Sequence, residues 1–490
     1  MKLFTFFSLN RILQFVFLVF LAAIPLGTKK FIYNFPIFLG DKISIFLYLS
    51  DLLLLIFLIV GIFWILKIWK SGSGKFHTNI LENVGMNVNI TKRIFLCLIL
   101  FVVLAGVSVF GAEERAISFY NFLRLVFLTI MAILTGILLR KNIINFERIV
   151  VVFAASAILQ SFVAFFQFKF QHSLGLWFLG ESFFMPWTNN VAKVMIEGGK
   201  LVRGYGTMPH SNILAGFLIL GLICLYYLFL KTDSKLRIYP PKFCFAKFGR
   251  VNPNLQIYTN MFIVSGIFAV WLGLIVTFSR SGWIVAIAST LLFIAWGLWD
   301  KEYRKRVLEL IVLLSLAACF LLLSFRWAII PRLHLSVDEP SVNYRILYNK
   351  IGWETIKNNF WGVGAGNQVL YGMRNGLYEK FGMKNSWEFQ PTHNLYILIA
   401  AEIGTLGLAA FLAFVLFLVI SNWQSVIGKF SGSLEIITNY QLLISILLFG
   451  LFDHFSWDLW QGQLMLWVIL GILMGISAHS SMDRVCPSEG

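Results

Sequence analysis

The sequence predicts an all-α integral membrane protein that crosses the bilayer many times. Of its 490 residues, 59% are hydrophobic and only 13% are charged, whereas a soluble domain carries about 25% charged residues. Apolar runs of about 20 residues, the length that a helix needs to cross a bilayer, recur along the whole chain. Water is therefore not the main solvent of this protein.

Twelve such runs are candidate transmembrane helices, so the expected architecture is a bundle of about twelve helices. The first run is followed by many others and has no small-residue cleavage site, so we expect it to be a membrane helix and not a cleaved signal. The predicted spans cover residues 10–27, 44–68, 93–112, 121–139, 149–170, 211–230, 258–278, 281–299, 307–326, 393–420, 438–454 and 463–478.

The distribution of charge gives the expected orientation. The formal net charge is +17, but the Lys and Arg residues lie in short segments between spans and leave no basic domain for nucleic acid. With the N-terminus inside, the short outside connectors hold only Lys29, Lys30, Lys42 and Arg115. Because cytoplasmic connectors are enriched in Lys and Arg, we expect a plasma (inner) membrane protein with both termini in the cytoplasm.

Two connectors are long, about 172–209 and 327–392, and both are expected outside. Long loops in compact proteins are usually functional. In the second loop Tyr344, Tyr348 and Ile351 recur at helical spacing, which predicts an amphipathic helix over the outer mouth of the bundle. The alternative is a surface helix with no catalytic role.

The chain shows no internal repeat, and no proline lies deep inside a predicted span. Secondary transporters commonly have repeats and helices that Gly or Pro interrupts near the membrane midplane. Their absence from the sequence pattern makes transport a less favoured function without excluding it.

The sequence SRSGW at 279–283 fills the tight outside turn between the seventh and eighth spans. Arg280 offers a planar, permanently charged fork that suits phosphate oxygens. We predict that Ser279 and Ser281 help to bind the substrate. The alternative is an arginine that only anchors a helix end by snorkelling. Because the turn contains almost nothing else, the functional interpretation is favoured.

The sequence PTHNLY at 391–396 opens the tenth span. His393 is expected at the outer rim of the bundle, where a neutral imidazole can accept a proton near physiological pH. Asn394 beside it is a predicted substrate-binding residue. The alternative for His393 is an interfacial histidine that bonds to a loop carbonyl.

Two further segments contain glycine beside arginine. Arg203 opens RGYGT at 203–207, shortly before His210 at the start of the sixth span; glycines near an arginine allow an anion to approach the backbone closely. Arg345 lies on the expected loop helix, ahead of GVGAGN at 362–367. No βαβ unit surrounds this glycine run, so we expect a flexible turn that returns the loop to the membrane, not a dinucleotide site.

In this order, Arg203, HSN at 210–212, SRSG, Arg345, GVGAGN and HNLY resemble the O-antigen ligase and polymerase superfamily. The closing segment, with FDHF at 452–455 and WQGQ at 460–463, is also similar to that family. The likeness is strongest from about 200 to 470. The first five spans are similar only as hydrophobic helices.

The resemblance implies a GT-C-like, inverting glycosyltransferase that uses a polyprenyl-diphosphate-linked glycan donor. The arginines that match Arg280 and Arg345 would hold the diphosphate, and His393 would activate the acceptor hydroxyl; these three are the predicted catalytic residues. Arg203 and His210 are predicted to bind substrate. The chemistry agrees, because fixed cations stabilise a leaving diphosphate and a base activates a hydroxyl.

The resemblance also suggests how the chain is organised. We expect N-terminal transmembrane helices and a first external loop in 1–200, a ligase-like core in 201–480 that includes the external loop 327–392, and a cytoplasmic tail in 481–490.

No metal and no other cofactor is expected. The five cysteines are scattered without a CxxC pair, and no DxD pair lies in the outside segments, whereas hard cations need clustered oxygen ligands. Asp51, Asp453 and His454 are predicted to be polar contacts between helices. The less favoured alternative is a direct chemical role for Asp453 or His454.

The predicted function is an enzyme that transfers or polymerises a lipid-linked glycan at the outer face of the membrane, in surface polysaccharide or lipopolysaccharide assembly. Its partners would be the donor, membrane lipid and an acceptor that is a glycan, a lipid or a protein. The main alternative is a transporter or flippase for lipid-linked glycan or a small anion. A third, weaker alternative is a membrane scaffold without activity.

Overall fold

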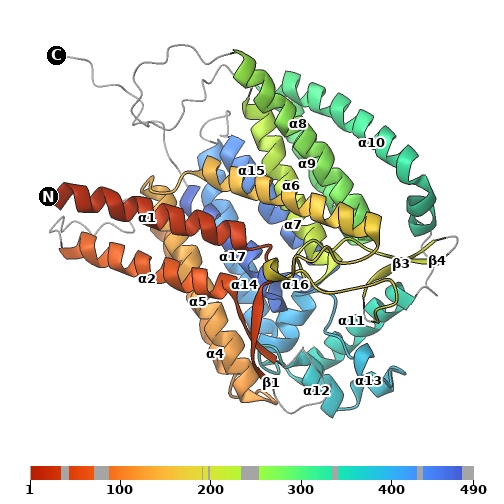
Figure 1. Ribbon diagram of the computed structural model, residues 1–490. Helices are drawn as coiled ribbons and strands as arrows, with labels where there is room; N and C mark the ends of the chain where they lie inside the picture. The colour runs from red at the N-terminus through yellow and green to blue at the C-terminus, as the bar shows by residue number, and fades with distance from the viewer. Residues whose placement is uncertain are drawn as a thin grey trace.

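The computed structural model describes residues 2–34, 44–70, 88–189, 191–196, 199–232, 253–333, 340–427 and 434–476. Twelve helices correspond one by one to the predicted spans (Figure 1). They are α1 (Lys2–Ala23), α2 (Leu49–Lys70), α4 (Val88–Ser108), α5 (Arg115–Arg140), α6 (Phe146–Phe170), α7 (Ser211–Lys231), α8 (Pro253–Val276), α9 (Arg280–Trp299), α10 (Arg304–Leu333), α14 (Leu395–Ile427), α15 (Leu434–Phe449) and α17 (Trp460–Ile476). The predicted tail 481–490 lies outside the described residues.

Length and composition support membrane crossing for most of these helices. Within the described residues, nine are long and apolar enough to span a membrane, and α1, α15 and α17 have shorter apolar segments. This confirms the prediction of a polytopic helical membrane protein.

Helix α7 forms the centre of the bundle. Of its apolar window, 89% is buried, the largest share among the candidate spans of the described chain. It packs against α6, α8, α9 and α15, while α17 packs along α5 and α14 along α4. An ion pair of 3.3 Å joins Asp51 of α2 to Arg124 of α5, which agrees with the helix contact predicted for Asp51.

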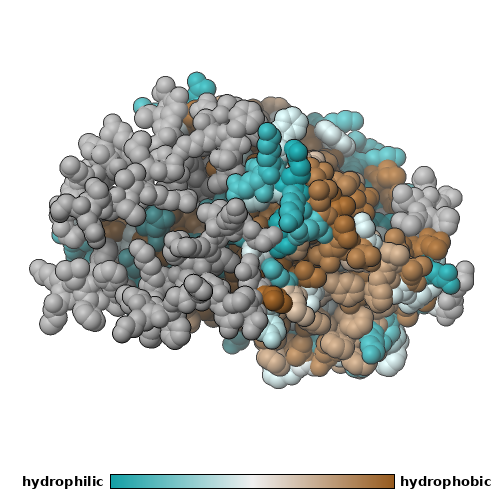
Figure 2. All heavy atoms as spheres, turned by 90° about the horizontal axis from the view of Figure 1, so that it is seen from above, coloured by the Kyte–Doolittle hydropathy of each residue, from teal (hydrophilic) through white to brown (hydrophobic). Residues whose placement is uncertain are grey.

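Helix α10 lies at the edge of the bundle (Figure 1). Only 22% of its apolar window is buried, and Leu308, Val312, Leu316 and Phe320 are exposed at intervals of four residues. Such a stripe is what a lipid-facing helix presents. Figure 2 shows the same property on a larger scale, as a broad hydrophobic surface with smaller hydrophilic groups.

The remaining elements gather at one end of the bundle, at the lower right in Figure 1. We call this the loop end. It carries the antiparallel hairpins β1 (Lys29–Asn34) with β2 (Ser44–Tyr48) and β3 (Lys193–Ile196) with β4 (Gly199–Val202), and the short helices η3 (Trp177–Leu179), α11 (Pro340–Asn358), α12 (Gln368–Arg374), α13 (Leu377–Lys380), η4 (Ser386–Glu388) and α16 (Phe455–Asp458).

Helix α11 is the amphipathic helix that the sequence predicted. Tyr348 and Ile351 are buried in a small core of their own, together with residues of α12, α13 and Ile117 of α5. Tyr348 also donates its hydroxyl to the Glu388 carbonyl at 2.8 Å. The helix is therefore held by a folded cap and does not simply lie on a surface.

The segment GVGAGN is not the flexible turn that we expected. The backbone N–H groups of Val363 and Gly364 donate to the carbonyls of Ala401 and Glu402 at 2.9 and 2.8 Å. They can do so because α14 is interrupted at Gly404, which has φ 83° and ψ 165°. A helix break frees carbonyls that need partners, and the glycine run supplies those partners.

Candidate active site

Two of the predicted site residues, Arg203 and Arg345, meet around Asp453, between α15 and α16. The Asn212 side-chain amide donates to Asp453 Oδ2 at 2.8 Å, and Arg345 Nη2 forms an ion pair with the same oxygen at 3.9 Å. Arg203 Nη2 donates to Asn212 Oδ1 at 2.9 Å. Three segments far apart in sequence, 203–212, α11 and the α15–α16 connection, are therefore joined by hydrogen bonds and one ion pair.

Arg203 is buried and held on both sides. Besides its bond to Asn212, its Nε donates to the carbonyl of Thr277 at 2.5 Å. Burial and the positive charges of Arg332 and Arg345 lower the pKa of Arg203, but a guanidinium still remains charged near neutral pH. The site thus contains a buried cation that two hydrogen bonds hold in place.

Glutamines of α6 set the path of the chain around Arg203. Gln167 is fully buried; its Oε1 accepts from the N–H groups of Tyr205 and Gly206, and its Nε2 donates to the Gly206 carbonyl at 2.8 Å. Gln160 Oε1 accepts from the Thr207 N–H at 2.9 Å, and its Nε2 donates to the Thr207 hydroxyl at 2.8 Å. These amides take the place of a neighbouring strand and satisfy backbone groups that would otherwise be buried without partners.

His393 precedes α14 and is oriented by a carbonyl. Its Nδ1 lies 2.9 Å from the Pro391 oxygen; because a carbonyl only accepts, Nδ1 carries the proton and Nε2 carries the lone pair. The ring stacks on Tyr348 at 5.0 Å and meets the His454 ring edge to face at 4.7 Å. Burial, and then the charge of His454, lower the pKa of His393, so it stays neutral and able to accept a proton.

His454 has the opposite protonation tendency. Its Nδ1 lies 2.7 and 2.8 Å from the two carboxylate oxygens of Asp458. Burial opposes its charge, but Asp458 and Asp453 outweigh burial and raise the pKa of His454. Burial likewise opposes ionisation of Asp453, yet His454 and Arg345 among its neighbours hold its pKa below the ordinary value. The cluster therefore places a histidine whose charged form is stabilised by carboxylates beside a histidine that favours its neutral form.

His210 plays a different part from His393. It is the N-cap of α7, and its Nδ1 accepts from the Asn212 backbone N–H at 3.1 Å. Its proton is then on Nε2, so the ring can donate to a ligand but has no free lone pair. Burial and the nearby charge of Arg203 lower its pKa to about 4. Of these two histidines, only His393 keeps a ring nitrogen that can act as a base.

The SRSG turn begins α9. Ser279 is the N-cap, and its Oγ accepts from the Gly282 N–H at 3.2 Å. Ser279 and Ser281 are buried, with their hydroxyl oxygens 3.4 Å apart. Arg280 is the first residue of the helix and is half-buried. The turn that positions Arg280 thus starts directly after Thr277, the residue that accepts from Arg203.

Asn394 is engaged in structure. Its Oδ1 accepts from the N–H groups of Tyr396 and Ile397 at 3.0 and 3.1 Å, which caps α14. Its amide donates to the Leu451 carbonyl at 3.1 Å. A role for Asn394 in binding substrate stays a prediction.

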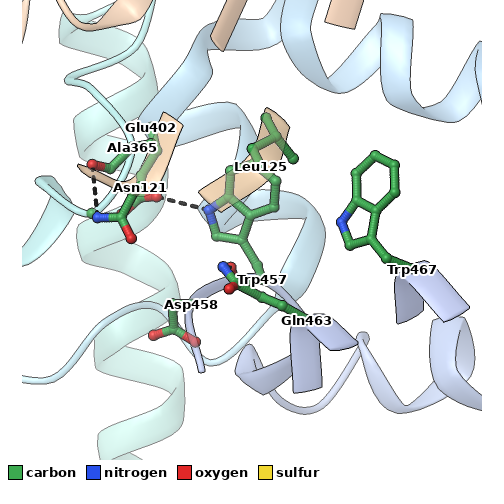
Figure 3. Close-up of a pocket in the computed structure, with 9 residues that line it drawn as sticks. Asn121, Leu125, Ala365, Glu402, Trp457, Asp458, Gln463 and Trp467 are labelled. Carbon is green, nitrogen blue, oxygen red and sulfur yellow. Dashed lines mark hydrogen bonds between the residues drawn. The ribbon is translucent and has the colours of Figure 1, made fainter. Parts of the chain in front are cut away.

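A mostly apolar pocket with a few polar side chains adjoins this cluster between α5, the glycine run, α14 and α16–α17 (Figure 3). Glu402 lies in it and accepts from the Trp457 indole at 2.7 Å. Asp458 lines the pocket as well and reaches His454 with its carboxylate. The site cluster is thus continuous with a second group of polar side chains.

The described residues offer no set of ligands for a metal ion. Over the part of the chain that the structure describes, no three His, Cys, Asp or Glu residues lie in a group that could hold a metal ion. Metal independence itself stays a prediction.

The prediction that Asp453 forms polar contacts between helices agrees with its contacts to Asn212 of α7 and Arg345 of α11. The sequence did not place Asp453 and His454 beside the predicted site residues Arg345 and His393. The connection returns over the bundle through α16, a single short turn. The adjacent ionisable pair at a span end and the HSN motif at 210–212 were the available signals; Asp458 gave none.

Comparison with known proteins adds a family assignment for part of the chain. Residues 265–412 match the family model described as O-Antigen ligase. That range runs from α8 into α14 and contains Arg280, Arg345 and His393, whereas Arg203 and Asp453 fall outside it. No curated protein matches the chain.

Proposed function

Because the chain belongs to the O-antigen ligase and polymerase superfamily, we propose that it transfers or polymerises a glycan from a polyprenyl-diphosphate-linked donor onto an acceptor hydroxyl. The observation that carries this proposal is that a neutral histidine, His393, packs against His454, directly beside the Asp453 on which Arg203 and Arg345 converge. The proposed site is at the loop end, which we assign to the outer face of the plasma membrane.

The arginines supply the donor half of the site. Arg203 and Arg345 converge on Asp453, and Arg280 lies in the turn next to them. As the bond between sugar and diphosphate breaks, negative charge grows on the leaving phosphate oxygen. Cations already fixed in place stabilise that charge more in the transition state than in the ground state.

His393 supplies the acceptor half. The acceptor oxygen forms a bond to the anomeric carbon while the bond from that carbon to the diphosphate oxygen breaks. The hydroxyl proton moves to Nε2 of His393, and polyprenyl diphosphate leaves with the electron pair. Direct attack of this kind inverts the anomeric configuration. A positioned base typically contributes about 10²- to 10⁴-fold to the rate, and no metal is needed in this scheme.

The cap around α11 suits a reaction that must exclude water. Tyr348 of α11 stacks on His393, and the buried core of α11–α13 fixes that tyrosine. A rigid cover beside the base would restrict hydrolysis of the donor. The proposal does not depend on whether the acceptor is a glycan, a lipid or a protein.

One observation favours a second candidate, the transport of a lipid-linked glycan. Helix α14 is interrupted at Gly404, and interrupted helices are common in transporters. Here, however, the glycine run bonds the freed carbonyls of Ala401 and Glu402, so the break is filled by protein. Transport would need the arginines but no base.

A sealed-vesicle assay separates the two functions. Purified protein in vesicles receives a polyprenyl-diphosphate oligosaccharide together with a panel of acceptors, and both release of polyprenyl diphosphate and movement of donor across the bilayer are followed. Transferase activity predicts release that depends on an acceptor and is lost in Arg345→Ala. Donor movement without release would establish transport and contradict the proposal.

A further inference from the structure

Arg332 lies at the last turn of α10, the helix at the edge of the bundle. It is half-buried, and its Nε approaches the Phe278 carbonyl at 3.4 Å. Arg326, six residues earlier on the same helix, is exposed. The end of α10 thus turns one arginine toward the bundle and leaves the other on the surface.

Arg332 and Arg203 approach the same turn. Arg203 Nε donates to the Thr277 carbonyl at 2.5 Å, and Arg332 Nε approaches the next carbonyl along the chain. Phe278, between α8 and α9, has φ 48°, a left-handed conformation that is uncommon for a bulky residue. Two guanidinium groups from distant elements therefore meet at two consecutive carbonyls, directly before Ser279 and Arg280.

Electrostatics agree with this closeness. Burial lowers the pKa of Arg203 most, and Tyr205 opposes it; Arg332 and then Arg345 lower the pKa further, and Asp453 opposes them less strongly. Like charges held together cost free energy that a bound anion would recover. A diphosphate carries negative charge on each phosphate group and would suit several arginine forks at once.

We infer that Arg332 is a further phosphate-binding residue, which adds a cation from α10 to the arginines that hold the diphosphate of the donor. The inference rests on the proposed function, because it names another ligand of the same group. It also gives α10 a role beyond its contact with lipid, since the end of this helix closes the donor site from the side of β3.

The test measures binding of farnesyl diphosphate to the full-length protein in phosphatidylcholine nanodiscs. The variants are Arg332→Gln, Arg332→Lys and the matched control Arg326→Gln. Loss of a charge-assisted hydrogen bond is expected to weaken binding about tenfold to a hundredfold in Arg332→Gln. Arg332→Lys should bind more tightly than Arg332→Gln but less tightly than wild type, because it keeps the charge and loses the planar fork.

The outcomes separate the two proposals. Binding by wild type with an unchanged affinity in both Arg332 variants would overturn the role of Arg332 and leave the donor site standing. Absence of binding by wild type would overturn the donor site itself. If Arg332→Gln lowers the Tm, the affinities of Arg332→Lys and Arg326→Lys for farnesyl diphosphate are compared instead. Equal affinities of these two variants would refute the inference.

Two further arms identify the source of the phosphate. Inorganic diphosphate and phosphatidylglycerol nanodiscs are compared with the farnesyl probe. If the affinities for farnesyl diphosphate and for inorganic diphosphate both fall when Arg332 is replaced, the ligand of Arg332 is a diphosphate. A dependence seen only with phosphatidylglycerol would show that Arg332 binds bulk anionic lipid and would contradict the inference.

Discussion

Replacing Asp453 by asparagine removes the charge at the centre of the cluster and keeps its shape. The carboxylate is 6% exposed. It accepts from Asn212 at 2.8 Å and from the His454 N–H at 2.9 Å, and Arg345 lies 3.9 Å away. Because the two donors bond different carboxylate oxygens, Asp453→Asn keeps an acceptor for only one of them, turns an NH2 group toward the other, and leaves the nearby cations without their counterion.

The expected cost follows from those three contacts. The bond that survives changes from a charged to a neutral acceptor and loses about 1 kcal/mol, while the other, made to a charged group, is lost at a cost of about 1.5–3 kcal/mol. The Arg345 side chain is 34% exposed, so solvent screens its attraction and it adds less than about 1 kcal/mol. The free energy of unfolding should therefore fall by about 3–5 kcal/mol.

The difference should depend on pH in a defined direction. Cationic neighbours hold the pKa of Asp453 below its ordinary value in the folded protein. A carboxyl with a depressed pKa contributes stability above its unfolded pKa, about 3.9, and loses it as the pH falls through the folded value. Wild type and Asp453→Asn should thus differ fully above about pH 5, and the difference should shrink progressively as the pH falls below about 3.9 toward the depressed folded value.

The assay is equilibrium unfolding in detergent, followed by tryptophan fluorescence. The control is Asp300→Asn between α9 and α10, where the carboxylate accepts only an exposed local bond from the Glu302 N–H at 2.9 Å. The control should change the free energy of unfolding by less than about 0.5 kcal/mol. Equal losses in the two variants, or a loss in Asp453→Asn that persists at low pH, would refute the electrostatic reasoning.

Four further outcomes are expected. His210→Asn should transfer glycan at a rate within about tenfold of wild type, because asparagine also caps a helix. Circular dichroism measures the helix content, and release of polyprenyl diphosphate measures the rate. Gln167→Ala should lower the free energy of unfolding by about 2–3 kcal/mol, since it leaves buried backbone groups unpaired, whereas Gln390→Ala at an exposed site should have little effect. Gly404→Ala should destabilise by at least about 1 kcal/mol, because φ is 83° and a Cβ would lie 2.7 Å from a carbonyl oxygen. Because the pKa of His393 is lowered, the rate of transfer should persist as the pH falls below about 6.5, where an unperturbed histidine would take up a proton; a pH–rate profile checks this.

The helices of this protein could be predicted from sequence because long apolar runs have few alternatives to a membrane helix. The amphipathic α11 was also predictable, since Tyr344, Tyr348 and Ile351 recur at helical spacing. The interruption of α14 was not. Gly404 in an apolar helix looks like an ordinary packing residue, and its left-handed conformation depends on a glycine run about forty residues earlier in the chain.

The sequence could not predict that residues from distant segments come together in one site. Asn212 and Asp453 bond each other across 241 residues, and no local pattern marks such a pair. Gln160 and Gln167 are isolated polar residues in the apolar span 149–170, yet they hold the segment that carries Arg203. Arg332 lies at the start of the long connector 327–392, and no local pattern relates it to Arg203.

The most direct test of the transferase account is the acceptor-dependent release of polyprenyl diphosphate by wild type and His393→Gln, measured together with donor affinity. The account predicts that wild type releases the diphosphate only when acceptor is present. His393→Gln should lose at least about 10²-fold in rate while it binds the donor within about threefold of wild type. A variant that releases polyprenyl diphosphate at the wild-type rate would show that His393 is not the base and would contradict the account.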